Sequence, residues 1–358
     1  MLSTGVKILD IQKRMQDFNV PGASITYFDD GKIQWNKGFG VLRKGTLKYV
    51  NGHSIFHACS ISKMITSLCT LKLVEAGVLD LFGEANHYLN SWKIPDNDFT
   101  KNKKIKLIHL LSHQAGFYDI DGSFEPYKNG DSVPNNVDIL KGKTRYNLEE
   151  VHAKYVPETD WAYSDAGFCV IEQIIKDVTR ENICQVADRL IFKPLQLKST
   201  FFWEIGKEDE LSERYCFDNC AVGHDSNGDV VEEIRAHYPN LNGAALWSTS
   251  EELSVIALDI AKSYNGENGV VLSKDMSEIM LTPYAEKSFI GLGIFLGDDN
   301  GKQYFFSQGW GVGMQCKLRV YYKERRGVTV MTNSEPGMEQ DKALIGEIIN
   351  EVCKNNSI

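Results

Sequence analysis

Ser60 and Lys63 are the first residues whose types and spacing suggest catalysis. Lys63 lies in the mostly apolar segment 61–73, ISKMITSLCTLKL, and Ser60 is the only serine with a lysine three residues later. On a helix this spacing places both side chains on one face, one turn apart. Apolar surroundings lower the pKa of a lysine, and a neutral amine beside a hydroxyl can take its proton. The pair therefore predicts a serine nucleophile that is activated by lysine.

The expected position of Ser60 at a helix start adds to this interpretation. Backbone N–H groups and the helix dipole at an N-terminus stabilise developing negative charge, as an oxyanion requires. The alternative is a structural serine followed by a lysine whose charged end reaches the surface. Because a lone S-x-x-K pattern is weakly specific, the catalytic interpretation needs support from other segments.

A metal site is disfavoured at the two places where its ligands could gather. Cys216, Cys220 and His224 fall at four-residue intervals in CFDNCAVGH, but no fourth ligand is evident and the spacing matches no common zinc pattern. His109 and His113 also lie four residues apart, without the glutamate of an HExxH zinc-protease motif. We therefore predict no metal and no cofactor.

Two competing hydrolase classes are also disfavoured. A cysteine hydrolase using Cys59 or Cys69 lacks a recognisable histidine context. The chain contains no G-x-S-x-G sequence, which excludes the nucleophile motif of the α/β-hydrolases. Ser60 therefore remains the leading candidate for the nucleophile.

Hydrophobic periodicity predicts the elements that must position these residues. Residues 6–18 place Ile8, Ile11, Met15 and Phe18 on one helical face. After Pro21, two strands flank the hairpin signal Asp29-Asp30-Gly31, and helical patterns then dominate from about residue 60 to 285. Strands return from residue 288, and the last helix has an apolar face made of Leu344, Ile345, Ile348, Ile349 and Val352.

This order predicts an α+β fold with one antiparallel sheet built from both ends of the chain. The terminal helices should flank the sheet, and a mostly helical subdomain should be inserted between its strands. Residues 1–58 and 286–358 would form the sheet subdomain, and residues 59–285 the helical one, as a single catalytic unit. The seam between the two is the expected active site.

Composition limits the partners. The 358 residues carry a net charge of −9, which makes a nucleic-acid partner improbable, and the basic run at 101–106 is interpreted as a solvated connection. Neither an export signal nor an apolar run long enough to span a membrane is visible, and the eight cysteines are scattered. We expect reduced thiols, a cytoplasmic location, no membrane partner and a small-molecule or peptide substrate. No feature sets an oligomeric state.

Several segments in order resemble the serine β-lactamase and penicillin-binding-protein superfamily, in its class C-like branch. Residues 55–81, around Ser60, resemble the nucleophile helix of that branch, and residues 157–179, PETDWAYSDAGFCVIEQIIKDVT, resemble its tyrosine loop and the following helix. The remaining similar segments are IKLIHLLSHQAGF, FKPLQLKSTFF, NGAALWSTSEEL and GLGIFLG. The resemblance implies a β-lactamase/transpeptidase-like fold over nearly the whole chain.

The resemblance also implies roles for individual residues. Ser60 would be the acylated nucleophile of a serine hydrolase that cleaves an ester, amide or D-amino-acid peptide bond. Lys63 and Tyr163 would move the protons, because a nearby ammonium stabilises a phenolate. Aligning GWGVG, residues 309–313, with the G-x-x-x-G turn makes the Trp310 N–H the second oxyanion donor beside that of Ser60. The alternative for Tyr163 is a buried structural tyrosine.

The first departure from the family pattern is Asp165. The tyrosine motif normally reads Y-x-N, whereas here it reads Tyr163-Ser164-Asp165. Asparagine can donate a hydrogen bond to a substrate carbonyl, but an ionised aspartate only accepts. We therefore expect Asp165 to face the cleft, to repel anionic substrates and to pair with a substrate ammonium.

The second departure is the third motif, normally a lysine or histidine, a small residue and glycine. Here it reads Ser307-Gln308-Gly309, or it places Gln308 at the basic position if the register slips by one residue. In either register the cation that would meet a substrate carboxylate is missing, unless Arg235 or His237 replaces it.

These departures predict a preference for neutral or cationic esters and amides over β-lactams and carboxylate-terminated peptides. An intracellular esterase, amidase or D-peptidase fits this preference. The competing hypothesis is a catalytically decayed member with a ligand-binding or interaction role, since fold does not fix function.

Overall fold

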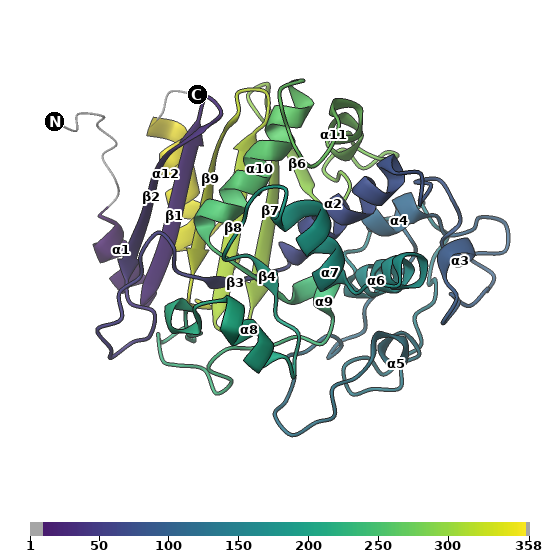
Figure 1. The fold of residues 1–358 in the computed structure, drawn as a ribbon, viewed down its shortest axis with the longest axis horizontal. Coiled ribbons are helices and arrows are strands. Elements are labelled where there is room, and N and C mark those ends of the chain that lie inside the picture. Colours follow the sequence, from purple (N-terminus) through teal and green to yellow (C-terminus); the bar gives the residue numbers. More distant parts are fainter. Residues whose placement is uncertain (1–9, 356–358) are drawn as a thin grey trace.

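The computed structural model describes residues 10–355, and its main element is an antiparallel sheet contributed by both ends of the chain (Figure 1). The strand order is β2-β1-β9-β8-β7-β6, so the N-terminal hairpin lies beside the last strand. This confirms the predicted sheet. Its strands are β1 Gly22–Asp29, β2 Lys32–Gly40, β6 Phe295–Asp299, β7 Lys302–Gly311, β8 Met314–Tyr321 and β9 Arg326–Thr332.

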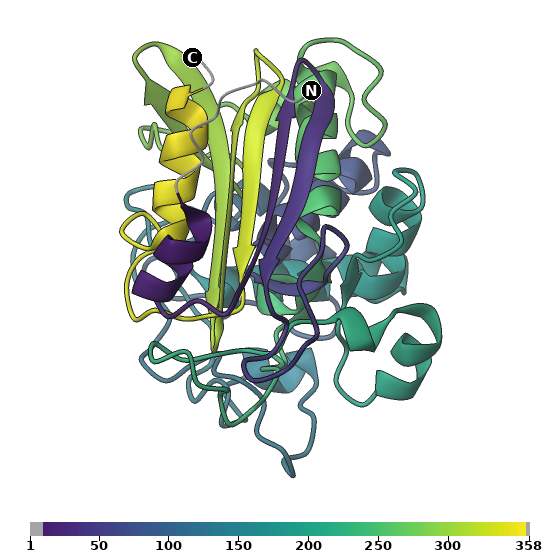
Figure 2. The same cartoon turned by 90° about the vertical axis from the view of Figure 1, so that its left-hand side faces the viewer.

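Two terminal helices, α1 Ile11–Asp17 and α12 Leu344–Asn355, cover one face of the sheet (Figure 2). Their apolar side chains form one buried cluster with alternate residues of β1 and β9. All five residues predicted for the apolar face of the last helix belong to this cluster. Ile8, which was assigned to the first helical face, lies outside the described residues.

The opposite face of the sheet packs against α10, Ser250–Tyr264, and the rest of the helical region (Figure 2). Nearly every side chain of α2, Ser62–Glu75, is buried there. The other elements of this region are α3 Ala85–Tyr88, α4 Leu107–Leu111, α5 Asn136–Leu140, α6 Asp165–Thr179, α7 Ile183–Ala187, η1 Asp188–Phe192, α8 Glu208–Arg214, η2 Phe217–Asn219, α9 Leu241–Ala244 and α11 Lys274–Met280. None of the helices within residues 10–355 combines the length and apolar character that a bilayer span requires.

A second, three-stranded sheet was not predicted from the sequence. It has the order β3-β5-β4, with β3 Phe56–Cys59, β5 Leu246–Ser248 and β4 Phe201–Phe202. Apolar runs this short cannot be distinguished from pieces of buried helix by periodicity. The proposed subdomain boundary between residues 58 and 59 falls inside β3. This strand ends at Cys59, directly before Ser60.

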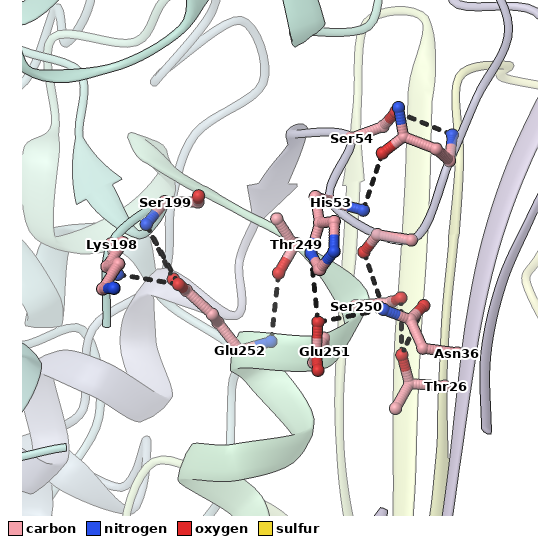
Figure 3. A network of polar contacts seen from close by, with 12 residues as sticks. Thr26, Asn36, His53, Ser54, Lys198, Ser199, Thr249, Ser250, Glu251 and Glu252 are labelled. Atoms are coloured by element: carbon pink, nitrogen blue, oxygen red, sulfur yellow. Dashed lines mark hydrogen bonds and ion pairs between the residues drawn. The ribbon is translucent and has the colours of Figure 1, made fainter. Parts of the chain in front are cut away.

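A polar network fixes the start of α10 between the sheet and the helical region (Figure 3). The Ser250 hydroxyl shares a 2.8 Å hydrogen bond with Thr26 of β1, and Glu251 accepts one from Asn36 of β2 at 3.1 Å. On the other side, Glu252 accepts from the backbone N–H groups of Lys198 and Ser199 at 2.7 and 3.0 Å. The predicted helix start at STSEE therefore also joins the two halves of the molecule.

Candidate active site

Ser60 lies in the turn between β3 and α2 and is partly exposed. The preceding residue, Cys59, has a φ of +47°, an uncommon conformation for a residue with a side chain. The Ser62 hydroxyl holds this turn, because it donates to the Cys59 carbonyl at 2.6 Å and accepts from the Leu246 N–H at 2.9 Å. These contacts present the Ser60 side chain at the start of the buried helix.

Lys63 is 3% exposed and uses all three donors of its ammonium group. Its Nζ lies 3.2 Å from Ser60 Oγ, 2.8 Å from Asp165 Oδ1 and 2.9 Å from the Gly243 carbonyl oxygen. Burial lowers the pKa of Lys63, but the combined effect of Asp165 and Tyr163 raises it by more than burial lowers it. The net shift of the Lys63 pKa is therefore upward. The prediction of a lowered pKa is therefore wrong, and Lys63 is a cation that donates to Ser60.

Tyr163 lies next to this cation, with its ring centroid 4.8 Å from Lys63 Nζ. Burial raises the pKa of Tyr163 and so does the charge of Asp165, whereas Lys63 and a hydrogen bond with Ser60 lower it. The net shift is upward. Since Lys63 donates to Ser60 Oγ, the Ser60 hydroxyl hydrogen is left to point toward Tyr163.

His113 holds the tyrosine in place. Its ring stacks on that of Tyr163, with centroids 4.6 Å apart, and its Nδ1 accepts a hydrogen bond from the Ser164 N–H at 3.1 Å. Burial, with a smaller effect from Lys63, lowers the pKa of His113 to about 3, so the ring is neutral and Nδ1 is an acceptor. The sequence placed His113 in a family-like segment but gave it no role.

Asp119 anchors the start of α6 and was also missed. It accepts hydrogen bonds from the Ser164 hydroxyl at 2.9 Å and from the N–H groups of Asp165 and Ala166 at 2.5 and 3.3 Å. Burial and the neighbouring charge of Asp165 raise the pKa of Asp119 to about 6. Sequence gave no signal for this role, because Asp119 is one of several acidic residues in a polar loop.

Asp165 faces Lys63, so the position where the family has asparagine here forms an ion pair. Its Oδ1 accepts from Lys63 and from Asn240 Nδ2, the latter at 3.1 Å, and 22% of its side chain is exposed. Asn240 and Gly243, which come from the segment around α9, complete the charged cluster. The sequence gave no warning of these two contacts.

The register of the third motif follows from the alternation of side chains along β7. Ser307 and Gly309 lie on the same face of β7. This face packs against the chain just before Ser60, because a Cβ added to Gly309 would lie only 2.5 Å from the Ala58 carbonyl oxygen. Gln308 pairs with Lys317 and lies on the α12 face. Ser307, which is 4% exposed, therefore lies on the same face of β7 as Gly309, and Gln308 lies on the opposite face.

The Trp310 backbone lies at an uncovered edge of β7. Residues 312 and 313 form a two-residue turn, so Gly311 and Met314 form a hydrogen-bonded pair and Trp310 and Gln315 do not. The Trp310 N–H thus points away from β8, and β6 reaches only to Phe306 on that side. The Trp310 indole is directed elsewhere and donates to Glu335 at 2.9 Å.

Neither of the two alternative cations reaches the cleft as a free charge. The guanidinium of Arg235 donates to the backbone carbonyls of Phe217, Cys220 and Ala221, at 3.4, 2.9 and 3.2 Å. Burial lowers the pKa of His237 to about 4, so its ring is neutral at pH 7.

The possible metal ligands are not brought together. His224 uses Nδ1 with the Asn333 carbonyl at 2.7 Å and Nε2 with the Lys44 N–H at 3.1 Å, so it has no nitrogen left for a metal. Across residues 10–355, no three His, Cys, Asp or Glu side chains are arranged to hold a metal ion.

Sequence comparison places the chain among known families. The model of the Beta-lactamase family matches residues 10–350. The chain is 25% identical over 333 residues to Protein flp of Staphylococcus aureus strain MW2, an alignment that covers 90% of this chain and 61% of that protein. It is 27% identical over 191 residues to N-acetylmuramyl-L-alanine amidase of Bacillus subtilis strain 168, covering 51% of this chain and 42% of the amidase. The chain thus spans about three fifths or less of these relatives.

Structural comparison gives the same fold. The octameric penicillin-binding protein homologue from Pyrococcus abyssi superposes with a TM-score of 0.75 at 20% identity, covering 94% of this chain and 75% of that chain. D-amino acid amidase from Ochrobactrum anthropi SV3 superposes with a TM-score of 0.74 at 17% identity, covering 97% and 98%. The fold is therefore β-lactamase/transpeptidase-like, as predicted. Because the family model spans nearly the whole sequence, the chain belongs to the β-lactamase family.

Proposed function

We propose that this protein is a serine hydrolase of the class C-like branch that cleaves an ester, amide or D-amino-acid peptide bond through an acyl-enzyme on Ser60. The observation that carries the proposal is the 3.2 Å contact between Lys63 Nζ and Ser60 Oγ beside the Tyr163 ring. A small-molecule or peptide substrate would enter between β7 and the tyrosine loop.

Tyr163 is the proton acceptor in this proposal. Lys63 stays protonated because its three acceptors include a carboxylate, so it cannot take the Ser60 proton. Tyr163 accepts the proton in its phenolate form, which the neighbouring Lys63 ammonium stabilises. As Ser60 Oγ attacks the substrate carbonyl carbon, the Ser60 proton passes to this phenolate and leaves Tyr163 as a neutral phenol. Tyr163 then donates the proton to the leaving group, and a water molecule repeats the sequence to release the acyl group.

The oxyanion would be bound by the backbone N–H groups of Ser60 and Trp310. The first lies just before α2, and the second points away from β8 at the open edge of β7. Gly309 permits this arrangement because any Cβ there would collide with Ala58 and Cys59. Two fixed backbone donors of this kind stabilise a tetrahedral intermediate without reorganisation.

A decayed, ligand-binding member is the second candidate. The observation that favours it is the ion pair itself, because Asp165 raises the pKa of both Lys63 and Tyr163 and so hinders proton transfer at neutral pH. In that case Ser60 would bind ligands without forming a covalent bond.

One experiment separates the two candidates. The protein is incubated with a fluorophosphonate or a reactive penicillin and analysed by intact mass, with Ser60→Ala as the control. We expect a single adduct that peptide mapping places on Ser60 and that the variant lacks. A folded protein that takes no adduct from either reagent excludes the hydrolase and leaves the ligand-binding candidate.

A further inference from the structure

We infer that Asp165 selects substrates that carry a free ammonium group next to the scissile ester or amide bond. This inference rests on the proposed function and assigns a substrate class to the same site. The asparagine usual at this position would present an amide, whereas Asp165 presents a carboxylate beside the nucleophile.

The two oxygens of Asp165 are used differently. Oδ1 accepts from both Lys63 and Asn240, which fixes the side chain. Oδ2 has no hydrogen-bond partner among the described residues, and it is not fully buried. The exposed 22% of the side chain therefore includes an acceptor oxygen that is fixed in direction and accessible to solvent.

The charges around Ser60 do not cancel. Lys63 contributes one positive charge, whereas Asp165 and Asp119 contribute two negative charges once the pH exceeds the pKa of Asp119, which is about 6. All three donors of Lys63 are engaged within the protein. An incoming ammonium would meet a net negative site with a free acceptor, and a substrate carboxylate would meet no available cation.

An aromatic wall beside Tyr163 suggests what else the substrate carries. Trp161 packs edge-on against Phe289, with ring centroids 5.2 Å apart, and Phe295 lies 6.5 Å from the Tyr163 ring. Phe289 is 41% exposed, so part of this wall is available to a ligand. Amino-acid amides or esters with a free amino group and an apolar side chain combine the two features.

The test compares pairs of substrates with a free and with an acetylated amino group. These are phenylalanine p-nitroanilide and its N-acetyl derivative, each as the D and L form, with p-nitrophenyl acetate as a neutral reference. In the parent protein we expect kcat/KM to favour the free amino substrate by at least about tenfold, the scale of one hydrogen bond to a charged group. The preference should fall toward one as the pH rises past the substrate amino pKa of about 8.

Two variants separate a specific contact from general electrostatics. Asp165→Asn should remove most of the preference for the free amino substrate. The preference is measured as the ratio of kcat/KM for the two substrates, so that a change in basal activity cancels. Asp160→Asn removes the same charge three residues before Tyr163, from a side chain that is 70% exposed, and should keep the preference. An equal fall in both variants would overturn the contact with Asp165.

The remaining outcomes distinguish this inference from the proposed function. If p-nitrophenyl acetate acylates Ser60 but the parent shows no preference for the free amino substrate, the substrate class is wrong and the hydrolase stands. If no reagent acylates Ser60 in the folded protein, the proposed function fails and the inference fails with it.

Discussion

Within the described part of the chain, two buried lysines each lie beside a carboxylate, and their pKa values shift in opposite directions. Lys63 is 3% exposed and pairs with Asp165, while Lys317 is 1% exposed and pairs with Asp341. Burial lowers the pKa of each lysine. The pKa of Lys63 nevertheless rises overall, whereas that of Lys317 falls. Burial alone therefore does not determine the charge of a lysine in this fold.

The partners account for the difference. The Asp165 side chain is 22% exposed and Tyr163 adds to its effect on Lys63, whereas the Asp341 side chain is 63% exposed and screened by solvent. Arg319 also lowers the pKa of Lys317 by like-charge repulsion. Lys63, in α2 on the helical side of the sheet, thus belongs to a network of charged partners, whereas Lys317, on the α12 side, has a single solvated partner.

The largest expected effect is on catalysis, and we expect it from substitution of Lys63 but not of Lys317. Lys63→Met and Tyr163→Phe should each lower kcat by at least about a hundredfold, because the first removes the cation that stabilises the developing negative charge and the second removes the proton acceptor. Lys317→Met is the matched control and should leave kcat within about twofold of the parent, since it lies on the other face of the sheet. The measurement is kcat for p-nitrophenyl acetate.

The double variant Lys63→Met/Tyr163→Phe sharpens this result. Residues that act as one unit give non-additive losses, so the double variant should lose little more than the worse single variant. Multiplicative losses would show that the two residues serve independent steps.

The next effect is on stability and compares the two carboxylates. Asp165→Ala leaves the buried Lys63 charge without its anion and should lower the free energy of unfolding by about 3 kcal/mol or more. Asp341→Ala removes a mostly solvated partner and should cost less than about 1 kcal/mol. Urea denaturation of both variants at pH 7 measures the difference. Equal losses would show that Asp165 protects its lysine no better than Asp341 does.

The sequence predicted those parts of the fold and the site that depend on the residue pattern within a single segment. The apolar face of α12 and the strands of the main sheet follow from periodicity within single segments, and the spacing of Ser60 and Lys63 places them one helical turn apart. The charge state of Lys63 could not be predicted in this way. Its carboxylate lies 102 residues later in the chain and its carbonyl partner 180 residues later.

The third motif shows the same limit. The letters Ser307-Gln308-Gly309 allow two registers, and only the packing of Gly309 against Ala58 decides which residue faces Ser60. The missed residues His113 and Asp119 act through contacts with Ser164 from a distant loop. Contacts between segments that are far apart in the sequence leave no periodic signal in either segment.

A smaller effect concerns the pH dependence of catalysis. The negative charge of Asp165 raises the pKa of Tyr163, so Asp165→Asn should lower that pKa. The acidic limb of kcat/KM for p-nitrophenyl acetate should then move to lower pH, because Tyr163 accepts a proton at lower pH. Lys317→Met should leave the limb in place. A limb that does not move in Asp165→Asn would show that another group controls the acidic side.

The smallest effect is on stability at alkaline pH, where the two lysines should behave oppositely. The folded pKa of Lys317 lies below the ordinary value of 10.5, so between these values the unfolded state binds more protons and the contribution of Lys317 to stability rises with pH. The folded pKa of Lys63 lies above 10.5, so its contribution is complete below that value and is lost only at higher pH. Urea titrations of the parent and Lys317→Met from about pH 8 to about pH 10 test the first case, because ionisation of other groups cancels in the difference. The parent should gain stability relative to Lys317→Met over this range. If the difference in unfolding free energy between the parent and Lys317→Met does not change with pH, Lys317 keeps its proton up to pH 10.5. Asp341 would then stabilise the charge of Lys317 as well as Asp165 and Tyr163 stabilise that of Lys63.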